Sequence, residues 1–263
     1  METILDKIIE QKKREVLLLR EGQRPLQNKI NPKRSLIKRL QTANEISIIA
    51  EFKRASPSKG VINNTTLPAD QAKLYEEYGA SAISVLTDYM FFKGSFTDLT
   101  TVRETVDLPI LCKDFIIDPI QIEFAEANGA DIILLIVAAL DEKKLINLYE
   151  YAKQLGLEVL VEVHNQVELE KALKTGAKLI GINNRDLRTF HVSLEVTEKL
   201  ASAVRSSGAF LISESGIFHQ EDVERVRNSG ANGILVGEAL MKSPDVKQSF
   251  LNFRLPLSKE VGR

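Results

Sequence analysis

The sequence predicts an α/β fold, a TIM-type (β/α)8 barrel preceded by an additional N-terminal helical extension over residues 1–42. Eight apolar segments alternate with eight helix-like segments between residues 46 and 250. Several of the apolar segments, such as ADIILLIV, show no polar alternation, which is typical of parallel strands covered on both faces. Most helix-like segments end at a glycine, which readily takes the left-handed conformation of a helix C-terminus. We expect one domain over residues 1–263, because this length suits a single barrel.

The N-terminal extension is polar and helical in pattern. Its apolar residues recur at roughly helical spacing: Ile4, Ile8, Ile9, Val16 and Leu19. Pro25 and Pro32 interrupt the region. Packing of this extension against the barrel is the simplest interpretation, and a lid over one end of the barrel is the alternative.

The remaining elements follow in regular order. The expected strands cover residues 46–52, 81–86, 109–115, 131–137, 157–163, 178–183, 209–213 and 232–236. The expected helices cover residues 68–78, 97–106, 119–128, 141–155, 166–175, 194–205, 220–228 and 244–250, and residues 88–96 are expected to form a loop. An open, doubly wound sheet is the structural alternative, but it usually has fewer strands, and no GxGxxG motif follows the first strand.

Composition narrows the possible partners. The chain has 35 Lys and Arg against 36 Asp and Glu, so its charge favours neither nucleic acid nor an anionic membrane as a partner. The N-terminus lacks a secretory pattern, and the longest apolar run, residues 132–140, is too short to span a bilayer. The single cysteine, Cys112, lies in an apolar run and is expected to be a buried structural thiol in a reducing compartment. We therefore expect a cytoplasmic protein, and a monomer.

Charged and polar residues follow the apolar part of most strands. These residues are Glu51, Lys53, Lys113, Glu162, Asn183, Arg185, Glu214 and Glu238. The carboxyl ends of the strands of a (β/α)8 barrel meet at one rim, where the active sites of this fold lie. Alternation along a strand places Leu111 and Lys113 on the same face, so that Leu111 fills the barrel and Lys113 projects into its mouth. So many acids and bases on one rim indicate a catalytic site.

The last two strand ends suggest that the ligand carries a phosphate. Ser215-Gly216 and Gly237-Glu238 follow strands seven and eight, whose loops often bind phosphate through backbone N–H groups. Ser56 and Ser58 could add hydroxyl donors from the first loop, and Glu238 would contribute its backbone N–H. Phe92 and Phe115 lie in rim loops and could contact an aryl group. The histidines lack metal-ligand spacing, so we expect no metal and no cofactor, and a supporting or surface position for His164.

Seven motifs in order resemble the indole-3-glycerol phosphate synthase family. They are IIAEFKRASPSKG, SVLTD, LCKDFIID, LVEVH, IGINNRDL, ISESGI and LVGEALM, spread over residues 45–245. The resemblance implies a carboxy-lyase of tryptophan biosynthesis. Its substrate would be 1-(2-carboxyphenylamino)-1-deoxyribulose 5-phosphate, closed to indole-3-glycerol phosphate with loss of CO2 and water.

The resemblance also implies roles for individual residues. Lys113 would be the general acid that protonates the ketone oxygen, and Lys53 a second cation near the substrate. Glu162 would be the base, Glu51 would orient a lysine, and Asn183 would hold the substrate in its folded conformation. The implied substrate-binding residues are Arg185 for the carboxylate, Glu214 and Ser215 for the sugar chain, and Phe92, Phe115, Pro57, Leu134 and Leu187 for the aryl ring. The implied phosphate-binding residues are Ser56, Gly216, Gly237 and Glu238.

One departure from the family and three rival functions complete the prediction. Some family members place an aromatic residue of the N-terminal helix near the aryl group, whereas the first aromatic residue here is Phe52. An aminoketose isomerase, like that acting on phosphoribosylanthranilate, would need an Asp/Cys pair, and Cys112 has the wrong strand parity to face the mouth with Lys113. A Schiff-base aldolase using Lys113 is the second rival, and a barrel that binds without catalysis is the third.

Overall fold

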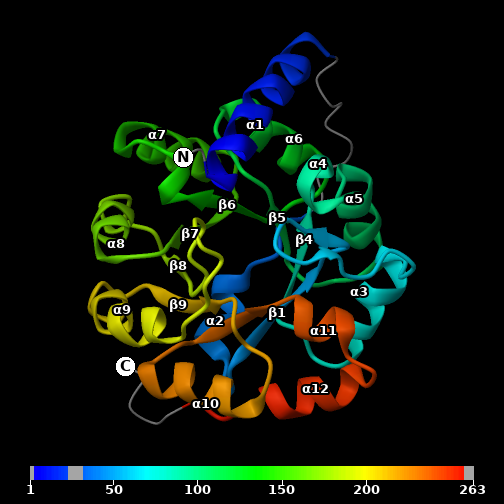
Figure 1. The fold of residues 1–263 in the computed structure, drawn as a ribbon, viewed down its shortest axis with the longest axis vertical. Coiled ribbons are helices and arrows are strands. Elements are labelled where there is room, and N and C mark those ends of the chain that lie inside the picture. The colour runs from blue at the N-terminus through cyan, green and yellow to red at the C-terminus, as the bar shows by residue number, and fades with distance from the viewer. Residues whose placement is uncertain (1–2, 23–31, 258–263) are drawn as a thin grey trace.

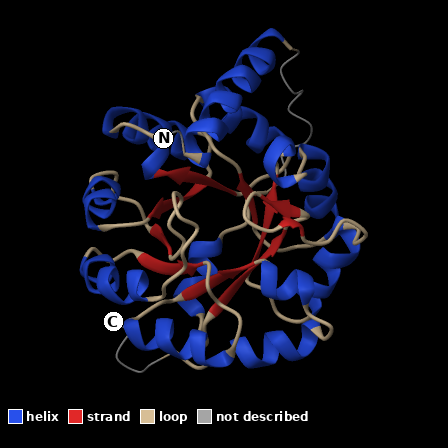
Figure 2. Cartoon of the chain, viewed as in Figure 1, coloured by secondary structure: helices blue, strands red, loops and turns tan. Residues whose placement is uncertain are grey.

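The computed structural model describes residues 3–22 and 32–257, and eight parallel strands in it form a closed barrel (Figures 1 and 2). The barrel strands are β1 (Ser47–Phe52), β4 (Ala82–Leu86), β5 (Ile110–Lys113), β6 (Ile132–Ile136), β7 (Glu158–Val163), β8 (Leu179–Asn183), β9 (Phe210–Glu214) and β10 (Gly233–Val236). Each strand pairs with its neighbours in chain order, and pairing of β1 with both β4 and β10 closes the ring. The predicted fold class is confirmed.

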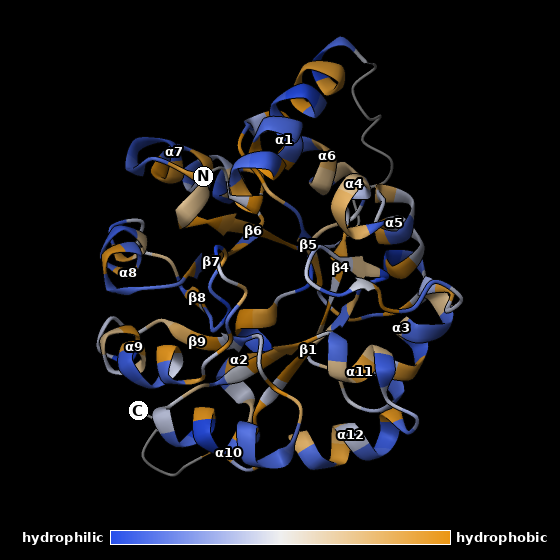
Figure 3. Ribbon diagram, viewed as in Figure 1, coloured by the Kyte–Doolittle hydropathy of each residue, from blue (hydrophilic) through white to orange (hydrophobic). Residues whose placement is uncertain are grey.

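Helices surround the strands. The longer helices that follow strands are α3 (Pro68–Glu77), α5 (Phe96–Thr105), α6 (Pro119–Ala127), α7 (Glu142–Gln154), α8 (Gln166–Leu173), α9 (Glu195–Ser206), α10 (Gln220–Ser229) and α12 (Val246–Phe253). The barrel strands are mainly hydrophobic, whereas the helices around them mix hydrophobic and hydrophilic residues (Figure 3). This difference agrees with strands buried on both faces and helices buried on one.

Alternation along the strands separates two apolar layers, as predicted. Alternate residues of a strand belong to different clusters. Leu111, Leu160 and Ile212 belong to the cluster inside the barrel. Their neighbours Cys112 and Val161 belong to the larger cluster between the strands and the helices. Lys113 therefore continues the inner face of β5 beyond Leu111 and reaches the mouth of the barrel.

The N-terminal extension forms two helices that serve opposite ends of the barrel. Helix α2 (Leu36–Thr42) contributes Leu36 and Leu40 to the inner apolar cluster, and it is visible within the ring of strands in Figure 1. Glu158, the first residue of β7, accepts the N–H of Leu36 at 3.0 Å and that of Ile37 at 3.2 Å, so α2 is anchored where the strands begin. Helix α1 (Ile4–Glu21) lies at the other end, where the strands finish.

The short elements were not predicted. Residues 88–96 contain a four-residue helix, α4 (Tyr89–Phe92), because the Asp88 carboxylate accepts the backbone N–H groups of Phe91 and Phe92. The turn after β1 is a small hairpin of β2 (Ala55–Ser56) and β3 (Gly60–Val61). A 3-10 turn, η1 (Val137–Ala139), and helix α11 (Glu238–Lys242) were also missed. Elements this short have no periodic pattern that a sequence could reveal.

Two further expectations concern Pro25 and the membrane. The expected interruption at Pro25 lies outside the described residues. Within residues 3–22 and 32–257, no helix combines the length and the apolar character that crossing a membrane requires.

Candidate active site

A cavity opens at the carboxyl ends of the strands, and every predicted site residue lines it. These residues are Glu51, Lys53, Ser56, Pro57, Phe92, Lys113, Phe115, Leu134, Glu162, Asn183, Arg185, Leu187, Glu214, Ser215, Gly216, Gly237 and Glu238. They come from all parts of the chain after residue 50, and the barrel topology brings them to one rim. Their placement together is a feature of the structure, while their individual roles stay predictions.

Helix α1 supplies cavity residues that the sequence did not single out for this position. Ile4, Leu5 and Ile8 line the mouth. They make this part of the cavity wall aliphatic. The helical spacing of Ile4 and Ile8 was visible in the sequence, but spacing alone does not say which surface a helix covers. Phe190, Ile217 and Phe218 were likewise missed because they lie in irregular loops.

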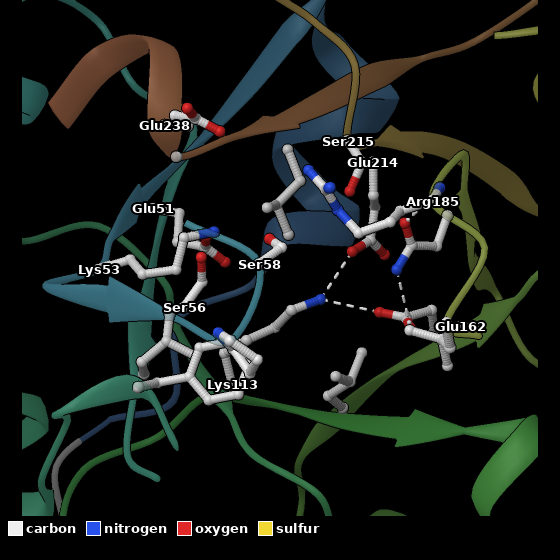
Figure 4. Close-up of a pocket in the computed structure, with 18 of the residues that line it drawn as sticks. Glu51, Lys53, Ser56, Ser58, Lys113, Glu162, Arg185, Glu214, Ser215 and Glu238 are labelled. Carbon is white, nitrogen blue, oxygen red and sulfur yellow. Dashed lines mark hydrogen bonds and ion pairs between the residues drawn. The ribbon is translucent and has the colours of Figure 1, made fainter. Parts of the chain in front are cut away.

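Lys113 is the centre of the charged cluster (Figure 4). Its Nζ lies 2.9 Å from Glu162 Oε2 and 2.6 Å from Glu214 Oε2. The three side chains project from β5, β7 and β9, and only small fractions of them are exposed. Lys113 donates hydrogen bonds to both buried carboxylates, a geometry that stabilises its charged form at the cavity wall.

The environment sets the charges of this cluster. Burial disfavours a charged Lys113, but the carboxylates of Glu162, Glu214 and Glu51 outweigh it and raise the pKa of the ammonium above its usual range. Burial would also raise the pKa of Glu162, yet Lys113 and His164 hold that pKa well below its usual range. Glu214 differs, because burial and the neighbouring Glu162 exceed the effect of Lys113 and raise its pKa to about 7. At neutral pH, Lys113 is thus a cation and Glu162 an anion.

Two further side chains hold Glu162. Asn183 Nδ2 donates a hydrogen bond to Glu162 Oε1 at 3.1 Å. His164 Nε2 lies 3.3 Å from the same oxygen, and His164 Nδ1 lies 3.0 Å from Oε2 of Glu168. His164 does not line the mouth cavity, so the structure agrees with the supporting position expected for it. Glu162 is therefore fixed in direction before any ligand binds.

A second ion pair lies on the β1 side of the mouth. Lys53 Nζ is 2.5 Å from Glu51 Oε1, and the Glu51 side chain is almost fully buried. Gly237 contributes space to this arrangement, since a Cβ atom at residue 237 would collide with the carboxylate of Glu51. The glycine predicted for phosphate binding thus also makes room for an acidic side chain.

The cavity wall also has apolar and basic parts. The rings of Phe92 and Phe115 are 5.9 Å apart at an interplanar angle of 33°. Arg185 lines the cavity, and its guanidinium contacts only the backbone oxygen of Phe190, at 3.5 Å, among the residues that the structure describes. The same cavity thus offers an aryl carboxylate both an apolar surface and a guanidinium that no carboxylate of the described residues pairs.

The two loops after β9 and β10 have the backbone character of an anion site. Ser215 and Gly216 both take positive φ angles, 64° and 84°, and Gly237 precedes the first turn of α11. The Glu238 carboxylate lies 2.9 Å from Lys242 and 3.8 Å from Lys59, and these lysines lower its pKa although partial burial opposes them. Its charge is compensated by lysines, which leaves its backbone N–H as the group suited to an anion.

Cys112 is buried and lies 3.4 Å from the hydroxyl of Thr87, in the layer between the strands and the helices. Burial raises the pKa of its thiol to about 12. The predicted buried thiol is confirmed. Among residues 3–22 and 32–257, no three His, Cys, Asp or Glu side chains are grouped as metal ligands.

Comparison with known proteins gives one family. The family model for indole-3-glycerol phosphate synthase matches residues 5–253. The indole-3-glycerol phosphate synthase of Bacillus thuringiensis subsp. konkukian is 54% identical over 250 residues, covering 95% of this chain and 97% of the relative. The enzyme of the same name from Bacillus cereus strain AH820 has the same identity and coverage.

Two solved structures share the architecture at low identity. Thiamine phosphate pyrophosphorylase from Pyrococcus furiosus superposes with a TM-score of 0.60 at 20% identity, covering 83% of this chain and 96% of that one. A 3-hexulose-6-phosphate synthase superposes with a TM-score of 0.60 at 15% identity, covering 79% and 98%. These likenesses concern the barrel fold alone.

Proposed function

We propose that this chain, which belongs to the indole-3-glycerol phosphate synthase family, closes the indole ring with the acid–base cluster at its barrel mouth. The family makes it a carboxy-lyase of tryptophan biosynthesis that acts on a phosphorylated small molecule. The observation that carries the assignment of roles is Lys113 held between Glu162 and Glu214.

Ring closure needs an acid first. A ring carbon of the carboxyphenylamino group attacks the ketone carbon, and negative charge develops on the ketone oxygen. Lys113 would donate its proton to that oxygen, giving a hydroxyl group, and loss of CO2 would then return an electron pair to the ring. Arg185 would bind the carboxylate until it leaves, while the phenylalanine rings and the aliphatic side chains of α1 exclude water from it.

Loss of water needs an acid and a base together. Glu162 would remove one of the two protons of the CH2 carbon bound to the ring nitrogen, and an ammonium group would protonate the hydroxyl that departs from the former ketone carbon. Proton uptake by Glu162 weakens the attraction that raises the pKa of Lys113, so the two steps favour one another. Lys53, paired with Glu51, is the second candidate for the proton delivered to the hydroxyl. Asn183 would hold Glu162 in the correct position relative to the substrate.

The remaining contacts would follow the shape of the substrate. Glu214 and Ser215 would contact the sugar hydroxyls, and Leu134, Leu187 and Pro57 would complete the aryl wall. The phosphate would lie against the backbone at Gly216, Gly237 and Glu238, with Ser56 as a hydroxyl donor. We further propose that the enzyme is a cytoplasmic monomer, because a single chain supplies the whole cavity and its only cysteine is a buried free thiol. Sedimentation equilibrium would test the oligomeric state.

The rival reactions find less support. An Asp/Cys isomerase would require a thiol in the mouth, whereas Cys112 faces the helices. A Schiff-base mechanism would require a neutral amine, whereas the pKa of Lys113 is raised and its ammonium is paired twice. Borohydride should therefore trap no covalent adduct with Lys113.

The test is indole formation from 1-(2-carboxyphenylamino)-1-deoxyribulose 5-phosphate, followed by absorbance and fluorescence. We expect Lys113→Ala and Glu162→Gln each to lower kcat by about 10²–10⁴-fold, the range for a general acid or base. Glu195→Gln, at an exposed position of α9, is the matched control and should keep wild-type rates. Wild-type rates in either mouth variant would refute the assigned roles, and tight binding without indole formation by the wild-type protein would indicate a barrel that binds without catalysis.

A further inference from the structure

Helix α1 carries a lysine in the middle of its buried stripe. Ile8, Lys12 and Val16 follow one another at four-residue spacing, and their exposed fractions are 3%, 1% and 8%. A lysine is rarely buried to this extent unless it is paired. Lys12 lies outside the reaction chemistry described above, so its burial needs a separate explanation.

Three carboxylates surround the Lys12 ammonium. Its Nζ lies 2.7 Å from Glu15 Oε2, 2.9 Å from Asp88 Oδ2 and 2.7 Å from Asp114 Oδ1. Lys12 Nζ donates a hydrogen bond to Glu15 Oε2, and its contacts with Asp88 and Asp114 are ion pairs. Burial disfavours the charge, but Asp114 and Asp88 outweigh it and raise the pKa of Lys12 above its usual range. The group is a permanent cation within the protein.

The two buried aspartates hold the backbone beneath the aromatic wall. Asp88 Oδ1 accepts the N–H of Phe91 at 2.7 Å and that of Phe92 at 3.2 Å, which begins helix α4. Asp114 Oδ1 accepts the N–H of Phe115 at 2.7 Å. Lys12 therefore links the two segments that present the rings of Phe92 and Phe115 to the cavity.

We infer that Lys12 is a positioning residue for the aryl-binding part of the mouth, fixing Phe92 and Phe115 relative to helix α1 through Asp88 and Asp114. The inference rests on the proposed function, in which the aryl ring lies against these phenylalanines. Helix α1 also supplies Ile4, Leu5 and Ile8 to the lining of the same cavity. One ammonium group thus ties helix α1 to the two segments that carry Phe92 and Phe115, while the residues assigned to the sugar and the phosphate lie on other strands and loops.

Lys12→Met tests this, because methionine retains much of the side-chain length and removes the charge. We expect KM for the substrate to rise about tenfold or more, with a much smaller change in kcat, because the aryl contacts that substrate and transition state share are weakened while Lys113 and Glu162 are untouched. Arg20→Gln is the matched control, since it removes an exposed ion pair of the same helix with Asp118, at 2.8 Å. It should keep wild-type kinetics.

Competing probes separate positioning from a general loss of structure. Anthranilate should bind Lys12→Met about tenfold more weakly than wild type, whereas ribulose 5-phosphate should bind both alike. Equal weakening of both probes, or unchanged anthranilate binding, would overturn the inference. Asp88→Asn gives a second measurement if Lys12→Met unfolds, because it leaves Lys12 paired with Glu15 and Asp114 and should weaken anthranilate selectively but less.

These binding measurements stay informative if the enzyme activity is absent. A wild-type protein that forms no indole would refute the proposed function alone. The loss of anthranilate binding in Lys12→Met, measured by calorimetry, would still show that Lys12 positions an aryl subsite, and its retention would refute that role.

Discussion

His164 shows how a single side chain outside the cavity can set the charge state inside it. Its ring nitrogens lie between Glu162, 3.3 Å away, and Glu168, 3.0 Å away, and only 10% of the side chain is exposed. Burial disfavours the imidazolium, but the two carboxylates outweigh burial and raise its pKa to about 10. The positive charge on His164 helps to keep Glu162 ionised and ready to accept a proton.

This pKa makes folding stability depend on pH in a defined window. A histidine whose pKa is raised in the folded state contributes stability fully below its unfolded pKa of about 6.5 and loses it as pH rises through the folded value. We expect wild type to lose on the order of a few kcal/mol of unfolding free energy between about pH 6.5 and 10. His164→Asn should be less stable at pH 6, and the difference should shrink towards pH 10.

Urea unfolding at several pH values measures the effect. His191→Asn is the control, because His191 is exposed and should leave the pH dependence of wild type unchanged. If His164→Asn followed the wild-type slope across the whole window, the two carboxylates would not be raising the histidine pKa.

At the residue scale, strand alternation explains why the direction of several site side chains could be predicted from the sequence. Lys113, Glu162 and Glu214 each lie two residues beyond an apolar interior residue, so their direction follows from the pleat once the strands are assigned. No comparable pattern in the sequence indicated that Lys12 is buried. Its burial depends on carboxylates that are 76 and 102 residues away in the chain, and a lysine on a polar helix normally indicates a solvated face.

At the scale of elements, helix α2 closes the end of the barrel opposite the site. Leu40 is 4% exposed and packs with residues such as Ile49 and Leu111 inside the barrel. Glu158 fixes the start of the helix through the backbone N–H groups of Leu36 and Ile37 and the hydroxyl of Ser35. The helix is therefore part of the core, although its sequence lies before the first strand.

Leu40→Ala should destabilise the protein by about 2–5 kcal/mol, the cost of a cavity in a packed core. The midpoint of thermal unfolding should fall, while kcat/KM at 20 °C stays close to wild type because the mouth is at the other end. Leu251→Ala, at a residue of α12 that is 53% exposed, controls for the same chemical change and should hardly affect either quantity. Strong loss of activity in folded Leu40→Ala would show that helix α2 also shapes the site.

The elements also show why parts of the fold escaped prediction. The eight βα units have long apolar runs and glycines at helix ends, such as Gly129 and Gly230 with φ of 96° and 104°. Helix α4 depends instead on one capping aspartate, and the β2–β3 hairpin on two residue pairs. The extension was correctly predicted as helical within its described residues, but its division between the two ends of the barrel follows only from tertiary packing.

At the scale of the whole molecule, the chain before β1 contributes to both ends of the barrel. Helix α2 fills the end where the strands begin, and helix α1 forms one wall of the mouth where they finish. A ligand in the mouth would contact α1 and several barrel strands at once. Binding should therefore stabilise the folded molecule as a whole and not one loop.

The reaction product offers a test without turnover. Indole-3-glycerol phosphate at about one hundred times its Kd should add about 2.7 kcal/mol of stability, provided that the unfolded chain does not bind it. For a protein of this size, that corresponds to a rise in Tm of roughly 5–10 °C. Indole-3-glycerol without the phosphate should give a smaller shift at equal concentration, because the loops after β9 and β10 would lose their anion. An unchanged Tm at saturating product would mean that the product does not bind the folded state in preference to the unfolded chain, and would contradict the prediction. Equal shifts with and without phosphate would remove the phosphate role assigned to Gly216 and Gly237.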